Sequence, residues 1–256
     1  MFKKIALVAA VAASASFATY SYFPVGDAHK GEIEISDKYT WHNHWSMDRV
    51  NLNAKYNVAQ NLELSLQNLG YQIWNEDDRC DDDKVNGCPD NDGIYAMTVG
   101  ARYQFMPILI AALDVRLPLT SEDVTGKYDP FGLFAAIQFT KELVPNLWLG
   151  SELGFDWMFE DEKKEEGVTM SIQAELDYSI ASIGLTPWIG LEFDKQLTED
   201  KQVGHDVGGD ESQLTFWVGA QYDINQMFAV KANFAISNGD LYGDNNTLKG
   251  ALLIRF

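Results

Sequence analysis

The stretch that decides the fold is the last ten residues of the chain, Thr247-Leu-Lys-Gly-Ala-Leu-Leu-Ile-Arg-Phe256. Successive side chains of a β-strand point to opposite faces, so a period of two residues separates two surfaces. One surface of this stretch is apolar apart from a glycine, and it carries Leu248, Gly250, Leu252, Ile254 and Phe256. The other surface carries mostly polar or small residues. The pattern therefore predicts a strand with one apolar face that ends on an aromatic residue.

The same alternation recurs along the chain from Gly31 onward and gives twelve candidate strands. Each is about as long as the roughly 9–11 residues that a tilted strand needs to cross a membrane. The candidates are Glu32–Trp41, Met47–Val58, Asn61–Gln72, Ile94–Phe105, Ile108–Leu119, Phe131–Lys141, Leu147–Phe159, Val168–Tyr178, Ile183–Lys195, Ser212–Asp223, Phe228–Ile236 and Thr247–Phe256. A period of two by itself does not distinguish strands that face lipid from strands of a soluble sandwich.

The connections between these strands alternate in length, and this decides between the two alternatives. Short links are expected at residues 58–61, 106–107, 142–146, 179–182 and 224–227. Long polar segments lie between them, at residues 75–93, 120–130, 160–167, 197–211 and 237–246, and they hold 23 of the 38 acidic residues. Short turns at one rim and long loops at the other are typical of a membrane barrel, whereas a soluble sandwich has no reason to sort its loops.

With these strands, these loops and a terminal Phe256, the chain resembles the porin-like β-barrels of bacterial outer membranes. The resemblance implies an all-β, antiparallel transmembrane barrel of about 12 strands, with short periplasmic turns and long acidic extracellular loops. It also implies the outer membrane of a Gram-negative bacterium as the location, with outer-membrane lipid and lipopolysaccharide as neighbours. Phe256 would be part of the signal that the barrel-assembly machinery reads.

The amino terminus has the layout of a signal peptide. Met1-Phe-Lys-Lys is a short basic region, and a run of apolar residues follows that is too short for a comfortable membrane anchor. Cleavage is expected after Ala15 or Ala18, with Ala18 preferred, so that residues 1–18 are removed and residues 19–256 form one barrel domain. Loss of Lys3 and Lys4 changes the formal charge from −19 to −21, which argues against nucleic acid as a partner.

The face opposite the apolar one is expected to line a pore, and it is charged. The predicted pore-lining residues are Lys38, Lys55, Arg102, Asp114, Arg116, Glu152, Asp156, Glu175, Asp177, Glu192, Asp194, Lys231, Lys249 and Arg255. The acidic members gather on the middle strands, and most basic members lie on the first and last strands, which a barrel joins. An acidic and a basic wall would then face each other and orient polar solutes.

Two functions are compatible with this inward face. The preferred one is a porin-like channel for passive diffusion of small hydrophilic solutes, mildly cation-selective through its acidic loops and wall. The alternative is a non-conducting structural or surface-interaction barrel whose charges pair and fill the lumen, since twelve strands lie between filled barrels and wide porins. Inward glycines either leave space or mark bends of the wall, and these are Gly100, Gly150, Gly154, Gly190 and Gly219.

Residues 75–93 form the most acidic loop and contain both cysteines, Cys80 and Cys88. In an oxidising compartment the two are expected to form a local disulfide. Asp81, Asp83, Asp90 and Asp92 are candidate Ca²⁺ ligands, because hard cations prefer carboxylate oxygen. The spacing departs from a regular calcium loop, since Lys84 occupies a ligand position, so no firm metal site follows and Ca²⁺ is the one cofactor considered.

The sequence is interpreted as that of a non-enzyme. His42, His44 and Ser46 lie together near the long-loop rim and would be the starting point for a hydrolase, which is kept as a remote alternative. Such chemistry needs a serine activated by an oriented histidine. The surrounding residues match no motif of an outer-membrane hydrolase.

Overall fold

The computed structural model describes residues 22–42, 45–76, 92–95, 97–119, 121, 131–159, 167–198, 200–202, 205–207, 211–241 and 244–256. The strands are β1 Gly31–Trp41, β2 Trp45–Ala59, β3 Leu62–Glu76, β4 Gly93–Tyr95, β5 Met97–Met106, β6 Leu109–Leu117, β7 Gly132–Val144, β8 Leu147–Met158, β9 Gly167–Tyr178, β10 Leu185–Gln196, β11 Asp200–Gln202, β12 His205–Val207, β13 Ser212–Asp223, β14 Phe228–Gly239 and β15 Asn245–Arg255. Within these ranges no helix is long and apolar enough to cross a membrane.

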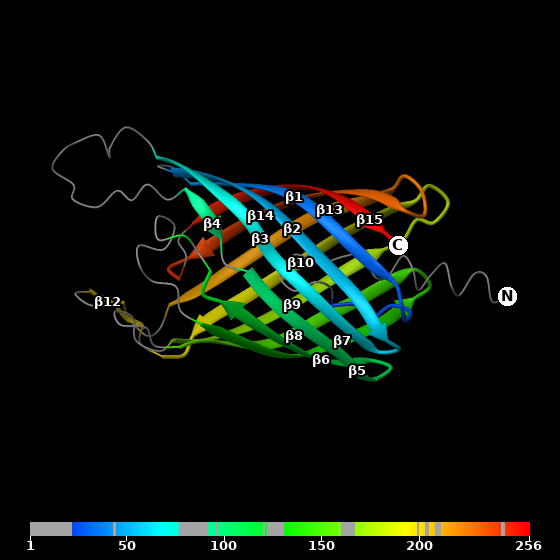
Figure 1. Ribbon diagram of the computed structural model, residues 1–256, viewed down its shortest axis with the longest axis horizontal. Coiled ribbons are helices and arrows are strands. Elements are labelled where there is room, and N and C mark those ends of the chain that lie inside the picture. Colours follow the sequence, from blue (N-terminus) through cyan, green and yellow to red (C-terminus); the bar gives the residue numbers. More distant parts are fainter. Residues whose placement is uncertain are drawn as a thin grey trace.

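Twelve of the strands form the wall of a closed antiparallel barrel (Figure 1). Around the wall the order is β1, β2, β3, β5, β6, β7, β8, β9, β10, β13, β14 and β15, and β15 pairs with β1. The prediction of a twelve-stranded antiparallel barrel is confirmed. The predicted strand Ile94–Phe105 corresponds to β4 and β5, which pair with β3 in one continuous register, since Gly70 faces Tyr95 and Gln67 faces Thr98. Residues 197–211, predicted as a loop, contain the small β11–β12 hairpin.

The barrel closes at its two outermost strands. Gly31 and Phe256 exchange both backbone hydrogen bonds, with N···O distances of 2.9 and 3.0 Å. The phenyl ring of Phe256 lies over Gly31, where a Cβ atom would come within 2.5 Å of the ring. Because these bonds pair the last strand with the first, the wall has no open edge for another chain to join. The role of Phe256 as an assembly signal stays a prediction.

The short connections lie at one end of the barrel, which we call the short-turn end, and the long ones lie at the other, the long-loop end. In Figure 1 the carboxyl terminus marks the short-turn end. Asn61 and Asn146 adopt φ angles of 68° and 71° in two of these tight turns. Asparagine tolerates this left-handed conformation better than most residues, which explains its use there.

The distribution of apolar residues is the inverse of that in a soluble protein. Among the described residues, 26 polar or charged side chains are buried, compared with 12 apolar ones. Large apolar side chains stand on the outside, and Val218 and Ile189 remain 53% and 59% exposed. In water this surface would be an aggregation liability, whereas in a bilayer it contacts lipid. The lipid-facing interpretation of the apolar strand face is therefore correct.

Aromatic rings of neighbouring strands cover several inward glycines. A Cβ atom on Gly190 would lie 2.2 Å from the Trp217 ring, and one on Gly219 would lie 2.5 Å from the Trp188 ring. Trp188 Nε1 also donates a hydrogen bond of 2.9 Å to Asn233 Oδ1. The space that these glycines leave is thus occupied by rings, which corrects the idea that they widen the lumen.

Replacing Gly190 by valine should lower the stability of the folded barrel, because the new side chain collides with the Trp217 ring. Overpacking of this kind costs about 1–3 kcal/mol. The measurement is the urea midpoint of unfolding in lipid vesicles. Gly250→Val is the matched control, since a Cβ atom there meets nothing within 4 Å. Equal midpoints for the two variants would contradict the packing argument.

Candidate functional site in the barrel lumen

The structure places the fourteen predicted pore-lining residues on the inward side of the wall. Each is buried, lines the cavity described below, or pairs with another side chain in the lumen. They separate into two layers with different character. Near the short-turn end most of the charges, those of the first, last and third strands together with Arg102, are in ion pairs, whereas near the long-loop end several have no partner among the described residues.

The paired layer contains two glutamates of β1 that the sequence interpretation missed. Glu34 accepts from Lys249 at 2.6 Å and from Lys231 at 3.4 Å. Glu32 lies 3.5 Å from Lys55 and 3.3 Å from Arg255. The basic arc expected on the first and last strands is therefore largely neutralised. The signal was present, because the two-residue period puts both glutamates on the same face as Lys38.

Arg102 forms the centre of the paired layer and is only 3% exposed. Its Nη1 donates to Glu63 Oε1 at 2.9 Å, its Nε to Gln138 Oε1 at 3.0 Å, and its Nη2 to the backbone oxygen of Phe23 at 2.7 Å. A buried guanidinium is tolerated only when its donors are satisfied, and here three different groups accept from it. Arg102 thus joins three strands of the wall to the amino-terminal segment.

That segment, residues 22–30, enters the lumen from the short-turn end. His29 N donates to Asn57 O at 2.7 Å, which ties the segment to β2. Farther in, Tyr22 and Phe23 are fully buried, and the hydroxyl of Tyr22 donates to Gln173 Oε1. A Cβ atom on Gly150 would come within 2.4 Å of Tyr22, so this glycine makes room for the segment.

Sequence reasoning gave residues 19–30 no role. They follow the predicted signal peptide and lack the two-residue alternation of a strand, so the sequence pattern did not indicate where they lie in the barrel. The one available signal was composition, since Tyr22-Phe23-Pro24-Val25 is apolar and aromatic immediately before the first polar turn. A second bond, from Val25 N to Gln104 Oε1 at 3.0 Å, holds the stretch inside the barrel.

A cavity of about 640 Å³ occupies the lumen at the long-loop end, and we call it the chamber. Its lining comes from the long-loop halves of the wall strands, and Gln173 belongs both to the lining and to the contact with Tyr22. The amino-terminal segment and the Arg102 cluster therefore lie between the chamber and the short-turn end. Neutral polar pairs complete the wall, for example Thr40 with Thr247 at 3.1 Å.

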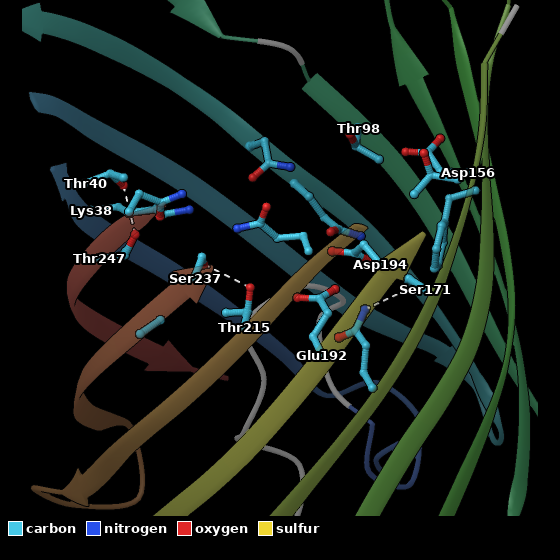
Figure 2. A pocket seen from close by; sticks show the side chains of 18 of the residues that line it. Lys38, Thr40, Thr98, Asp156, Ser171, Glu192, Asp194, Thr215, Ser237 and Thr247 are labelled. Atoms are coloured by element: carbon cyan, nitrogen blue, oxygen red, sulfur yellow. Dashed lines mark hydrogen bonds between the residues drawn. The ribbon is translucent and has the colours of Figure 1, made fainter. Parts of the chain in front are cut away.

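The chamber carries charges of both signs. Its charged lining residues are Lys38, Arg49, Arg116, Asp114, Asp156, Glu192 and Asp194. In Figure 2, Lys38 lies beside Thr40 and Thr247 on one wall, and Glu192 and Asp194 reach into the lumen from another. Lys38 and Arg49 thus lie apart from Glu192 and Asp194, whereas Arg116 shares β6 with Asp114, so the chamber shows the expected separation of charge only in part.

Several predicted sites fall outside the described residues. These are the signal peptide, both cysteines of the expected disulfide, and the Ca²⁺ candidates Asp81, Asp83 and Asp90. Asp92 is described and lies half-buried just before β4. Among the described residues no group of three or more His, Cys, Asp or Glu could hold a metal ion. Of the hydrolase candidates, His42 follows β1 and Ser46 lies on β2, whereas His44 is outside the described part.

The comparisons with known proteins agree with this architecture. An outer-membrane channel of Pseudomonas putida F1 superposes with a TM-score of 0.76 at 14% identity, over 94% of this chain and 100% of that one. The NanC porin superposes at 0.54 with 11% identity, over 87% and 98%. The translocator domain of the autotransporter NalP from Neisseria meningitidis superposes at 0.55 with 12% identity, over 91% and 90%.

At such identities the structural matches establish the fold alone. None of the curated protein sequences matches the chain. A family model described as "putative MetA-pathway of phenol degradation" matches residues 38–239. This match runs from the middle of β1 to the end of β14 and covers most of the barrel wall. The chain therefore belongs to this family.

Proposed function

We propose that the protein is an outer-membrane channel for passive diffusion of small hydrophilic solutes, with a mild preference for cations. The observation that carries the proposal is the chamber, a charged cavity of about 640 Å³ inside a closed barrel whose outer surface is apolar. Lumen charge sets ion preference in channels. Among the described residues, four carboxylates and three basic groups line the chamber, so their formal balance favours cations slightly.

Two of the similar folds support a channel role, because they are described as an outer-membrane channel and a porin. The family description concerns phenol degradation, and a phenol is a small aromatic solute. Of the described residues that line the chamber, one is aromatic, Phe134, and most of its neighbours are polar or charged. Its lining therefore favours solutes that are hydrophilic or charged over neutral aromatic ones.

In the conformation seen here the path through the barrel is occupied by residues 22–25. Tyr22, Phe23 and Val25 make polar contacts to side chains of the wall. We infer that this segment is a plug and that passage requires it to leave the lumen. The wall itself need not change, because the strands keep their pairing whether the segment is inside or outside.

The alternative is a non-conducting barrel that interacts through its acidic outer loops, for which Ca²⁺ is the candidate ligand. One observation favours it, namely the packed lower lumen in which Glu32, Glu34 and Glu63 are all paired. A barrel filled in this way is stable without transporting anything. The two proposals differ in a single measurable property, the passage of ions.

Single-channel recording of the refolded full chain in a planar bilayer tests the proposal. We expect infrequent discrete openings, because the plug occupies the lumen most of the time, and a reversal potential in a salt gradient that indicates cation preference. Silence of the full chain and also of a variant with a weakened plug would exclude the channel and leave the non-conducting barrel. Heat-modifiable migration in SDS gels verifies folding in both cases.

A further inference from the structure

We propose that the chamber binds a dipolar solute, with the anionic end at Lys38 and the ammonium end at Glu192 and Asp194. Such a solute would belong to the class that passes through the channel proposed above. The binding proposal rests on that function only for the route by which the solute arrives. Binding in the chamber does not require conduction. The two can therefore fail separately.

The first observation is the position of the charges around the barrel. Lys38 lies on β1 and Asp156 on β8, and five wall strands separate β1 from β8 in either direction. Glu192 and Asp194 lie on β10, which only β9 separates from β8. The acidic side chains of Asp156, Glu192 and Asp194 therefore lie apart from Lys38, on other walls of the chamber (Figure 2). A solute that spans the cavity meets opposite charges at its two ends.

The second observation is that these charges form no direct contact with an opposite charge, although Arg116 acts on Asp156, and Lys38 on Glu192, through space. In the part of the chain that the structure describes, Lys38, Asp156, Glu192 and Asp194 have no hydrogen-bond partner and no ion pair. Asp194 is nevertheless only 9% exposed. In the layer below, Glu32, Glu34, Glu63 and Arg102 are all paired. A buried charge without a partner is costly, so a group that supplies the missing charge is stabilised there.

The third step is the chemistry of each end. Two carboxylates two residues apart on β10 repel each other, and a cation placed between them relieves that repulsion. An organic ammonium suits them, because it can be held by two carboxylates alone, and among the described residues no group of three or more His, Cys, Asp or Glu could hold a metal ion. An ammonium group has three donors and can bridge separate carboxylates. A carboxylate on the solute is the natural partner of the Lys38 ammonium.

The remaining wall suits a polar solute of modest size. Thr215 and Ser237 form a hydroxyl pair at 2.9 Å beside the acidic strand. Hydroxyl groups can donate or accept hydrogen bonds. They can therefore contact the uncharged middle part of many different solutes. A cavity of about 640 Å³ accommodates an amino acid or a similarly small dipolar molecule with accompanying water.

Isothermal titration calorimetry of the refolded full chain in detergent micelles tests the inference with three probes of equal chain length. These are 5-aminopentanoate, which carries both charges, pentanoate, which carries one negative charge, and pentylamine, which carries one positive charge. We expect 5-aminopentanoate to bind about tenfold or more tightly than either single-charge probe. Its two ends interact with Lys38 and with the carboxylates of β10 at the same time, whereas each single-charge probe makes only one of these interactions. Equal affinities for the three probes would overturn the inference.

Substitutions assign the two ends. Lys38→Met should reduce the affinity for 5-aminopentanoate to that for pentylamine, and Glu192→Gln with Asp194→Asn should reduce it to that for pentanoate. Lys141→Met is the matched control, because Lys141 is exposed on β7 near the short-turn end and should leave all affinities unchanged. An unchanged affinity in Lys38→Met would also overturn the inference. Selective binding by a barrel that is silent in the bilayer would support it and remove only the channel.

Discussion

Replacing Tyr22 and Phe23 together by alanine should raise the time-averaged conductance of the barrel by a factor of ten or more. Both side chains are fully buried in the lumen. Burying a large apolar side chain contributes about 1.5–3 kcal/mol, so the plugged state should lose several kcal/mol relative to the open one. A loss of about 1.4 kcal/mol already corresponds to a tenfold change in an equilibrium.

The measurement is the fraction of time open in single-channel records, compared with the unaltered chain at the same protein density. Asp27→Asn is the matched control, because Asp27 belongs to the same segment but is exposed. It should leave the open fraction unchanged. If the double variant is folded and opens no more often than the unaltered chain, the segment is not the plug.

Reversing the charge of Glu192 and Asp194 to lysine should convert the channel from cation to anion preference. The chamber would then hold two carboxylates and five basic groups in place of four and three. Reversing one unit charge changes the energy of an ion about 4 Å away by about 2 kcal/mol even in water. Two such changes exceed the mild preference of the unaltered chamber, so the reversal potential should change sign.

The choice of residues matters, because not every inward carboxylate can be reversed without damage. Glu152 and Glu175 are 3% and 1% exposed and accept hydrogen bonds from Gln138 and Trp217. Lysine at either position would take the acceptor away from the Gln138 or Trp217 donor, bury an ammonium group beside it and disturb folding. Glu142→Lys, at an exposed position near the short-turn end, is the control for surface charge. A reversal potential that stays the same in the double variant would show that the chamber does not determine selectivity.

The period of the side chains was sufficient to predict the wall of the barrel. From Gly31 to Phe256 each wall strand alternates between apolar and polar residues. This alternation is required, because one face of the strand contacts lipid and the other faces the lumen. The same reasoning placed Lys38, Glu192 and Asp194 inward. It missed the pairing of β11 with β12, because a short local pairing leaves almost no periodic signal.

Charge pairing within the lumen was not predictable in the same way. Glu32 and Glu34 were visible on the inward face, but their partners come from β2, β14 and β15, and contact depends on how far each strand is shifted along its neighbour. That shift fixes which residues share a level. It decided that Glu32 and Glu34 meet basic partners in the lower layer, whereas Glu192 and Asp194 in the chamber do not.

The sequence by itself determined the class of fold, the apolar outer surface and the charged inner one, because these follow from a two-residue period in a chain that must satisfy both lipid and water. Only the tertiary structure decided what fills the lumen. Residues 22–25 have no periodic pattern, and their position depends on Arg102, Gln104 and Gln173, which lie far along the chain and converge only when the barrel closes. Closure is a property of all twelve strands together, so no single stretch encodes the plug or the chamber beyond it.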